Sequence, residues 1–447
     1  MNTTIFRRVI TLSLLIMLTS TFSVGQDLIP ITLEQVLKIG GSDNLTIQEY
    51  KAKQALSQAG LTKAKQWWLP EVYAGAQTFQ LWGAAMNSDG RFFLDVKRQN
   101  LWSGLGLKVN WDLAEGIYST KSAALKSEAS KYDSKAQKNQ TLFKMIEAYY
   151  DLQTAQLSYT AYQNLVKQSD SIVQQIQIQV DAGLLYQSEL LLAKSNKNHL
   201  KVEMLNAKIQ YNTLSAGLKK LLNIDQHVKL VISNPSLLPL DYTVDANTTA
   251  DSSATKRPEF QALSLRKQMF ETERKKYGTG MWYPEISIGT YGSYSGRING
   301  NVSPMFPAQY PETNQLYPTS ALNVSILWKI PIGELAYQGN QKELNSQILL
   351  NEIAVAQLHA QINNEVANAL TDIETGKEQI EIAKESIDLT SSALNQSIQR
   401  QKLGTAKPYE VFQAQQYFLQ AQLDYLGAVS SYNKAQFALK VAKGDML

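Results

Sequence analysis

Hydrophobic and polar positions along the chain follow two different periods, and each period occurs in two separate regions. In one region alternate positions are apolar, at Leu105, Leu107, Val109 and Trp111. The same alternation returns at Leu322, Val324, Ile326 and Trp328. Period-2 patterning is typical of a strand with one apolar and one polar face. It predicts two strand pairs, 71–82 with 101–112 and 285–296 with 320–330.

After each strand pair, apolar residues recur three and four positions apart over a long stretch without proline. This spacing predicts helices with coiled-coil packing, each about 100 Å long at about 1.5 Å per residue. Gly183 and Gly404 are expected to end them, because glycine readily adopts the left-handed conformation at a helix C-terminus. The prediction comprises long helices 116–182 and 337–403, return helices 188–222 and 408–443, and shorter helices 32–65 and 257–278.

The two regions are copies of one unit. The stretch from Trp68 to Val72 reappears as Trp282 to Ile286, and the alternating strand returns at an offset of 217. Landmarks that recur in the same order at nearly constant offset indicate a duplication. We expect a first repeat at 26–222 and a second at 257–447, joined by an irregular linker at 223–256. Loops 83–100 and 296–319, between the paired strands, are expected to be exposed; whether they plug a barrel is left open.

The N-terminus and the composition limit the classes of protein to which this chain can belong. Residues 1–25 read as a secretory signal peptide, with Arg7 and Arg8 before a short apolar run. Without that segment the formal charge falls from +4 to +2, which argues against a nucleic-acid partner. The chain has no cysteine, so disulfides and a lipid anchor on cysteine are excluded. The mature chain has no apolar run of about 18 residues, so any membrane crossing must use strands.

Residue patterns for catalysis or cofactor binding are absent from the sequence. His199, His227 and His359 are scattered without the spacing of metal ligands, and there is no phosphate-binding glycine loop. We therefore expect neither an enzyme nor a cofactor nor a metal site. An outer-membrane enzyme is accordingly disfavoured.

Four strands per chain cannot close a membrane barrel, and open strand edges are not tolerated in lipid. Three copies would give 12 strands. The fold class predicted is therefore a mixed α+β membrane protein, a trimeric 12-stranded β-barrel continuous with a long helical coiled-coil barrel. Such a molecule is a channel. The competing hypothesis is a secreted or periplasmic coiled-coil adaptor, which explains the helices but leaves the strand pairs without a role.

The chain resembles the TolC-like outer membrane efflux proteins. The resemblance rests on the duplicated helix–strand–strand–long helix–glycine turn–helix unit and on the stretch Gln401-Lys402-Leu403-Gly404-Thr405. It implies a homotrimer in the outer membrane with a long periplasmic portion. It also implies a closable periplasmic tip, a periplasmic adaptor, and an inner-membrane pump that supplies the energy for a passive exit duct. Drugs, metals and secreted proteins are not distinguished as cargo.

The resemblance also implies a gate at the tip. Counting from the turn at Gly404 and Thr405, the acidic ring positions fall on Glu410 and Gln413, of which only Glu410 keeps the charge. Glu410 could instead serve as a first-turn acid that complements the helix dipole. The matching first-repeat positions after Gly183 are Ser188 and Glu189.

The residues that would lock this gate differ from the family pattern. The usual tyrosine and arginine partners of Ser188 and Glu189 fall on Gln401 and Ala406, so the lock is altered. Arg400 or Lys402 is a hypothetical substitute for the lost charge.

Tryptophans near the strand ends suggest an aromatic belt at the membrane interfaces, with ordinary core packing as the alternative. The candidates are Trp68, Trp82, Trp102, Trp111, Trp282 and Trp328.

Overall fold

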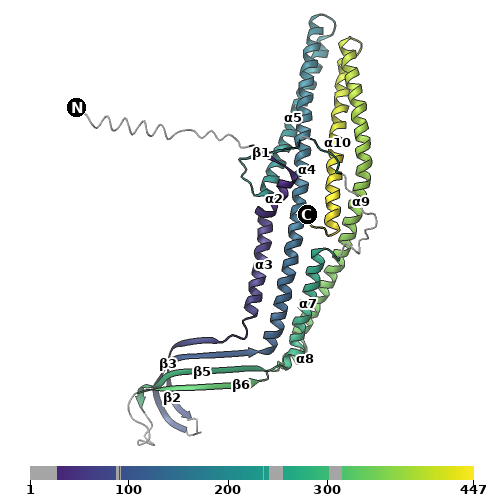
Figure 1. Ribbon diagram of the computed structural model, residues 1–447. Helices are drawn as coiled ribbons and strands as arrows, with labels where there is room; N and C mark the ends of the chain where they lie inside the picture. The colour runs from purple at the N-terminus through teal and green to yellow at the C-terminus, as the bar shows by residue number, and fades with distance from the viewer. Residues whose placement is uncertain (1–27, 87–89, 91, 235, 241–254, 302–314) are drawn as a thin grey trace, which may run out of the picture. The chain divides into compact units, whose positions relative to one another are not determined.

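The computed structural model describes residues 28–86, 90, 92–234, 236–240, 255–301 and 315–447, whose elements are labelled in Figure 1. The expected signal peptide and the expected loop residues 302–314 lie outside these residues. By packing, the chain divides into two units that each draw on both halves of the sequence. We call them the strand unit (50–136 and 255–360) and the helical unit (1–49, 137–254 and 361–447).

The strand unit contains one four-stranded antiparallel sheet with the order β2-β3-β5-β6 (Figure 1). Its strands are β2 (Glu71–Met86), β3 (Phe92–Asp112), β5 (Glu285–Asn301) and β6 (Leu316–Leu327). The prediction of an exposed loop at 83–100 is wrong, because β2 pairs with β3 from Glu71–Lys108 out to Met86–Phe92. Strands β5 and β6 likewise extend into the loop expected at 296–319. The backbone ladder continues beyond the predicted strand ends, since each further residue pair adds main-chain hydrogen bonds.

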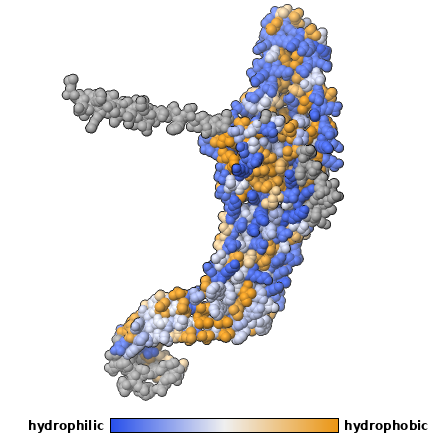
Figure 2. Space-filling view, viewed as in Figure 1, coloured by the Kyte–Doolittle hydropathy of each residue, from blue (hydrophilic) through white to orange (hydrophobic). Residues whose placement is uncertain are grey.

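The sheet has one apolar and one polar face. Leu107 lies opposite Val72 on β2 and Thr290 on β5, and Ile288 lies opposite Val324 on β6. These residues share one face because side chains alternate along a strand. Large apolar side chains on it are exposed to more than 40%, Leu107, Leu105, Val72, Leu322, Val324 and Ile326 among them. The space-filling view shows apolar residues gathered over the strands (Figure 2).

Helices of the strand unit are held together by polar side chains. The unit contains parts of α3 (Leu45–Ala64), α4 (Thr120–Asp181) and α9 (Gly339–Lys402), together with α7 (Pro258–Tyr277) and the short α8 (Ile332–Tyr337). A π-helical turn, Glu115–Ser119, joins β3 to α4. Ser127 Oγ donates to Gln58 Oε1 at 2.8 Å, and Ser122 Oγ donates to Glu273 Oε1 at 2.6 Å.

The helical unit contains two helical hairpins and an N-terminal helix. Its further helices are α2 (Leu33–Asp43), α5 (Gln187–Leu222) and α10 (Pro408–Ala442). The prediction of one uninterrupted helix over 32–65 is wrong, because the chain is extended at Asn44. The Asn44 side chain accepts a hydrogen bond from Ile47 N at 3.0 Å and donates one to Leu221 O at 2.7 Å. It therefore caps α3 and ties it to α5.

A short parallel pair of strands includes part of the linker region that we expected to be irregular. β1 (Leu28–Ile31) pairs with β4 (Lys229–Ile232). Gln156 of α4 accepts from Ile232 N at 2.9 Å and donates to Ile232 O, which fixes β4 to the long helix. On the other side, Asn433 of α10 donates to Leu238 O at 2.9 Å and accepts from Leu240 N at 2.8 Å. Side-chain amides from both repeats thus hold this segment.

The main hydrophobic core of the helical unit lies beside that strand pair. Met145, Ile146 and Leu152 of α4 pack there with Leu218 and Leu222 of α5. Gly40 of α2 packs closely here, because a Cβ atom would lie 2.1 Å from the Met145 sulfur and the end of that side chain would have to shift. No helix within the described ranges is both long and apolar enough to cross a bilayer.

Candidate functional site at the hairpin turns

The hairpins α4–α5 and α9–α10 turn with the same backbone geometry (Figure 1). Gly183 and Gly404 have φ of 70° and 73°, in the left-handed region that favours glycine. At the first turn Leu184 N donates to Gln179 O at 2.8 Å, and at the second Thr405 N donates to Arg400 O at 2.9 Å. Each turn also has the inner bond of a Schellman motif, so both long helices end in the way that the two glycines predict.

The two hairpins pack against each other through one apolar cluster near the turns. All four helices contribute buried side chains to it, and Ile176 (α4), Leu190 (α5), Leu394 (α9) and Val411 (α10) are representative. A hydrogen-bonded amide pair lies closer to the turns. Gln401 Nε2 donates to Gln179 Oε1 at 2.8 Å, and Gln179 Nε2 donates to Gln401 O at 3.4 Å. Gln401 is buried and Gln179 is half-buried, so this pair is a partly buried polar link between the two hairpins.

The second turn has a network of polar side chains. Thr405 Oγ1 donates to Arg400 O at 3.0 Å, and the Arg400 guanidinium donates to Thr405 O at 3.4 Å. Arg400 also forms an ion pair with Glu410, at 3.4 Å between Nη1 and Oε2. The other Glu410 oxygen accepts from Lys407 N at 3.2 Å, which caps α10. Glu410 therefore has the expected helix-start role, and it is also held by a cation from the opposite arm of its hairpin.

The first turn lacks such a network. Ser188 is exposed, and its side chain makes no hydrogen bond within the described part of the chain. Glu189 is half-buried. Its Oε2 atom is buried and has no hydrogen-bond partner among the described residues. Ala406, at the position of the family's arginine, is buried. In the single chain Arg400 pairs with Glu410 of its own hairpin, and its role as a substitute for that arginine stays a prediction.

A polar stripe on α10 continues from Glu410. Gln413 is exposed and donates to the Tyr417 hydroxyl at 3.3 Å, and Gln420 donates to Asp424 at 2.7 Å. These five residues lie three and four positions apart and so share one helix face. The sequence analysis named only the first two. Their 3/4 spacing was the signal that could have identified the other three.

Four of the belt tryptophans lie at one end of the sheet. Trp68 and Trp282 precede β2 and β5, while Trp111 and Trp328 lie at or just after the ends of β3 and β6. Trp68, Trp282 and Trp328 are exposed to between 55% and 61%. Trp111 Nε1 donates to Trp68 O at 2.8 Å, which fixes one ring against the neighbouring strand end. Trp82, exposed to 66%, lies toward the other end of the sheet.

Trp102 differs from the other five. It pairs with Gln77 and Ser295, on the face opposite Leu105. Its ring stacks on Tyr73 at 6.2 Å between centroids and meets the edge of Tyr291 at 6.0 Å. Trp102 thus belongs to an aromatic cluster on the polar face rather than to the apolar surface. Its membership of an interfacial belt stays a prediction.

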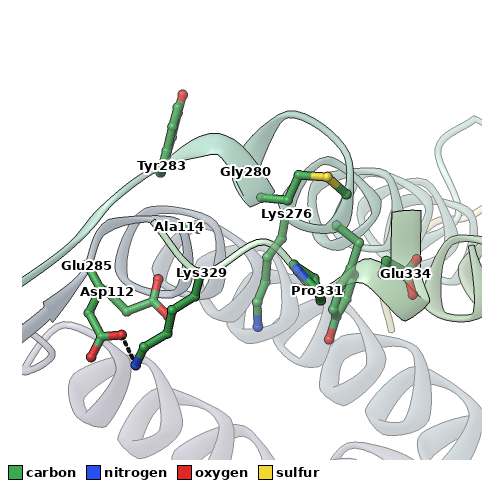
Figure 3. Close-up of a pocket in the computed structure, with 11 residues that line it drawn as sticks. Asp112, Ala114, Lys276, Gly280, Tyr283, Glu285, Lys329, Pro331 and Glu334 are labelled. Carbon is green, nitrogen blue, oxygen red and sulfur yellow. Dashed lines mark ion pairs between the residues drawn. The ribbon is translucent and has the colours of Figure 1, made fainter. Parts of the chain in front are cut away.

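A charged cavity of about 170 Å³ lies in the strand unit where strands meet helices (Figure 3). Lys329 forms an ion pair with Glu285, drawn as a dashed line in Figure 3. Lys276 pairs with Glu115; burial works to lower the pKa of Lys276, but the hydrogen bond and charge of Glu115 outweigh it and raise that pKa. The buried Glu334 accepts from Asn340 N at 3.1 Å and from Gln341 N, at the start of α9. Each lysine has a carboxylate partner and Glu334 accepts backbone hydrogen bonds, so we interpret the cavity as part of the packing between strands and helices.

The site therefore contains two helical turns and polar side chains, and within the described residues no group of three or more His, Asp or Glu could hold a metal. The described residues thus combine long helical hairpins with an antiparallel sheet that has one apolar face. Residues 253–445, somewhat less than half of the chain, match the family described as outer membrane efflux protein.

Solved structures with the same fold cover nearly the whole chain. The outer-membrane channel OprN is 16% identical, with a TM-score of 0.74 over 92% of this chain and 89% of that one. The CmeC outer membrane channel of Campylobacter jejuni is 16% identical, with a TM-score of 0.75 over 92% and 85%. The outer membrane protein VceC of Vibrio cholerae is 13% identical, with a TM-score of 0.74 over 93% and 96%. No curated protein matches the chain by sequence.

Proposed function

We propose that three copies of this chain form an exit channel through the outer membrane. The observation that carries this proposal is the four-stranded sheet, whose outer strands β2 and β6 each have one edge without a partner in the described part of the single chain. Unpaired backbone groups are costly in lipid, so β2 of one copy would pair with β6 of the next. Three sheets would then close a 12-stranded barrel, with the apolar face toward lipid and the polar face toward the lumen.

The hairpin turns would form the gate of this channel. Glu410 and the polar stripe of α10 would line the constriction, where three carboxylates favour cations and can bind multivalent blockers. The Gln179–Gln401 pair would hold the second turn against the first hairpin in the closed state. This link is uncharged, so closure would depend little on pH or salt, in contrast to a lock made of ion pairs.

The channel would conduct passively, because the chain contains no phosphate-binding loop for its own energy supply. A periplasmic adaptor and an inner-membrane pump would deliver the cargo. A groove of about 170 Å³ between α5 and α10 offers a contact for the adaptor. It is lined by polar residues of both hairpins, including Asn196, His199, Glu203 and Gln416.

Two measurements test the proposal. Native mass spectrometry in detergent should give three times the chain mass, and heating should change the electrophoretic migration as it does for membrane barrels. A monomer that stays soluble without detergent would overturn the barrel. In planar bilayers, Glu410→Gln should weaken block by a trivalent cation such as hexamminecobalt. Glu374→Gln removes an exposed acid about 40 Å along α9 from its end and should leave the block unchanged.

A further inference from the structure

The apolar face of the sheet continues past the end of β6. Apolar residues occupy every second position from Leu322 through Trp328 to Ile332. The short helix α8 then adds Leu335, three positions after Ile332 and on the same side of the helix. Ile332 and Leu335 are exposed to 77% and 52%, and Trp328 is exposed to 61%. The single chain therefore leaves this extension of the apolar face uncovered.

The opposite side of α8 is polar and buried. Glu334, with 7% exposure, accepts hydrogen bonds from Asn340 N at 3.1 Å and from Gln341 N at 3.2 Å. These two amides belong to the first turn of α9, so Glu334 holds α8 against the start of that helix. Glu334 also lines the charged cavity drawn in Figure 3. Helix α8 is thus amphipathic, with one side fixed to the protein and the other side open in the single chain.

The matching positions of the first repeat, at an offset of 217, make contacts within the chain. The alternation of the first repeat stops at Glu115, at the position of Ile332, and this carboxylate is held in an ion pair. At the position of Leu335 stands Tyr118, whose ring stacks on Tyr283 at 6.1 Å between centroids. The open apolar side of α8 is therefore a feature of the second repeat, and the packing of the unit does not account for it.

A lipid surface fits the open side of α8 by its position and by its chemistry. Trp328 and Trp282, exposed to 61% and 56%, lie at the same end of the sheet, and tryptophan is enriched where membranes meet water. The exposed apolar side chains of Val324 and Ile326 lead directly to this end. An amphipathic helix beside a membrane-facing surface lies in the interface, with its apolar side about 5–10 Å into the boundary between headgroups and acyl chains. Helix α8 has the composition and the position for this role.

We infer that α8 is an interfacial anchor, whose Ile332 and Leu335 insert into the leaflet of the outer membrane nearest the long helices. This inference rests on the proposed channel and adds a lipid contact outside the strands of the barrel. Because Glu334 fixes α8 to the first turn of α9, the anchor sets the level at which α9 leaves the membrane. Three copies would place three such anchors around the channel, one from each second repeat.

Spin labels on single cysteines test the anchor, because the chain has no native cysteine. The protein is reconstituted into vesicles of phosphatidylethanolamine and phosphatidylglycerol. Each nitroxide is then probed with oxygen, which partitions into lipid, and with a water-soluble nickel chelate. Ser346→Cys, exposed about two helical turns into α9, is the control whose label should be in water. At Ile332→Cys and Leu335→Cys the ratio of oxygen to nickel collisions should be about fivefold higher than in this control, because both labels lie below the headgroups.

A label at Leu322→Cys, on the apolar face of the sheet, distinguishes failure of the anchor from failure of the channel. If the labels at Leu322 and on α8 are all in water, the channel proposal fails and the anchor fails with it. If the Leu322 label lies in lipid while the α8 labels collide mainly with nickel, the anchor alone is refuted. The anchor is equally refuted if neither reagent reaches the α8 labels, because the next copy then covers them.

A polar substitution of the anchor gives a second, independent measurement. With the label at the exposed position Tyr337→Cys, the change Ile332→Asn/Leu335→Asn should raise collisions with the nickel chelate about fivefold, because α8 leaves the lipid. The matched control Ile332→Leu/Leu335→Ile keeps both positions apolar and should leave the collisions unchanged. Equal collision rates in the two variants would overturn the anchor. Native mass should remain that of the trimer in both, and its loss in the polar variant would identify a protein contact instead of a lipid contact.

Discussion

The two hairpin turns have one backbone and two different sets of side chains. Both end in a glycine with φ near 70° and the same Schellman bonds. Only the second adds Arg400, Thr405 and Glu410 as a polar network, while the first presents exposed Leu184 and Tyr186. The same backbone turn thus occurs with two different kinds of side-chain chemistry. Polar side chains within the second turn stabilise its conformation. The conformation of the first turn depends on apolar packing and on the amide pair.

The largest effect should come from the apolar cluster that both hairpins share. Leu190→Ala in the first hairpin and Leu394→Ala in the second should each cost about 2–5 kcal/mol, because each leaves a cavity among buried side chains. Hydrogen exchange of amides near the turns measures the loss. Leu192→Ala and Leu403→Ala remove exposed side chains of the same type and should change little. An effect confined to one hairpin would show that the cluster is not shared.

The amide pair should come next. Gln401→Leu leaves Gln179 without its partner in a half-buried site and should cost about 1–3 kcal/mol. It should also raise the open probability of single channels in planar bilayers. The double variant Gln179→Leu/Gln401→Leu removes both polar groups and should recover most of the stability. Additive losses in the double variant would contradict a direct link.

The turn glycines should respond alike in the two hairpins. Gly183→Ala and Gly404→Ala place a Cβ in the left-handed region and should each cost about 1–2 kcal/mol. Gly217→Ala and Gly427→Ala change glycines within α5 and α10 where the added carbon meets nothing within 4 Å, and should stabilise by up to about 1 kcal/mol. Thermal melting in detergent provides the comparison. Unequal losses at the two turns would show that their backbones are not equivalent.

The smallest effect should come from the ion pair of the second turn. Arg400→Gln should cost less than about 1 kcal/mol, because both partners are partly exposed. Its signature is salt dependence: the difference from the unsubstituted protein should shrink as ionic strength rises. A loss that is larger, or unaffected by salt, would mean that Arg400 acts through its backbone contact with Thr405.

Periodicity and turn chemistry predicted most of the elements, because strands and long helices are encoded locally. The glycines at 183 and 404 end the long helices for the expected reason. The break at Asn44 was missed, although an asparagine before a helix is a capping signal. The extra strand length near residue 92 was also missed, although Phe92, Leu94 and Val96 continue the alternation. In both cases the sequence contained the relevant pattern, and the prediction did not take it into account.

Contacts between distant segments could not be predicted in the same way. The pairing of β1 with β4 joins two short segments far apart in the sequence, and neither has a distinctive pattern. The altered residue Gln401 was identified, but its partner Gln179 follows only from how two hairpins pack. Trp102 was placed by its distance from a strand end, although its ring contacts with Tyr73 and Tyr291 come from the neighbouring strands β2 and β5. Partner choice is a tertiary property that local patterns leave undetermined.

The discontinuous helical unit constrains the order in which the chain can mature. Its first strand, β1, finds its partner only after residues 229–232 have emerged. Asn139 donates to Asp445 O at 2.9 Å and accepts from Leu447 N at 2.8 Å, so the unit also waits for residues 445–447. A chain that is synthesised from its N-terminus therefore cannot complete this unit until residues 445–447 are present. Before that point its unpaired strand and uncovered apolar side chains favour aggregation.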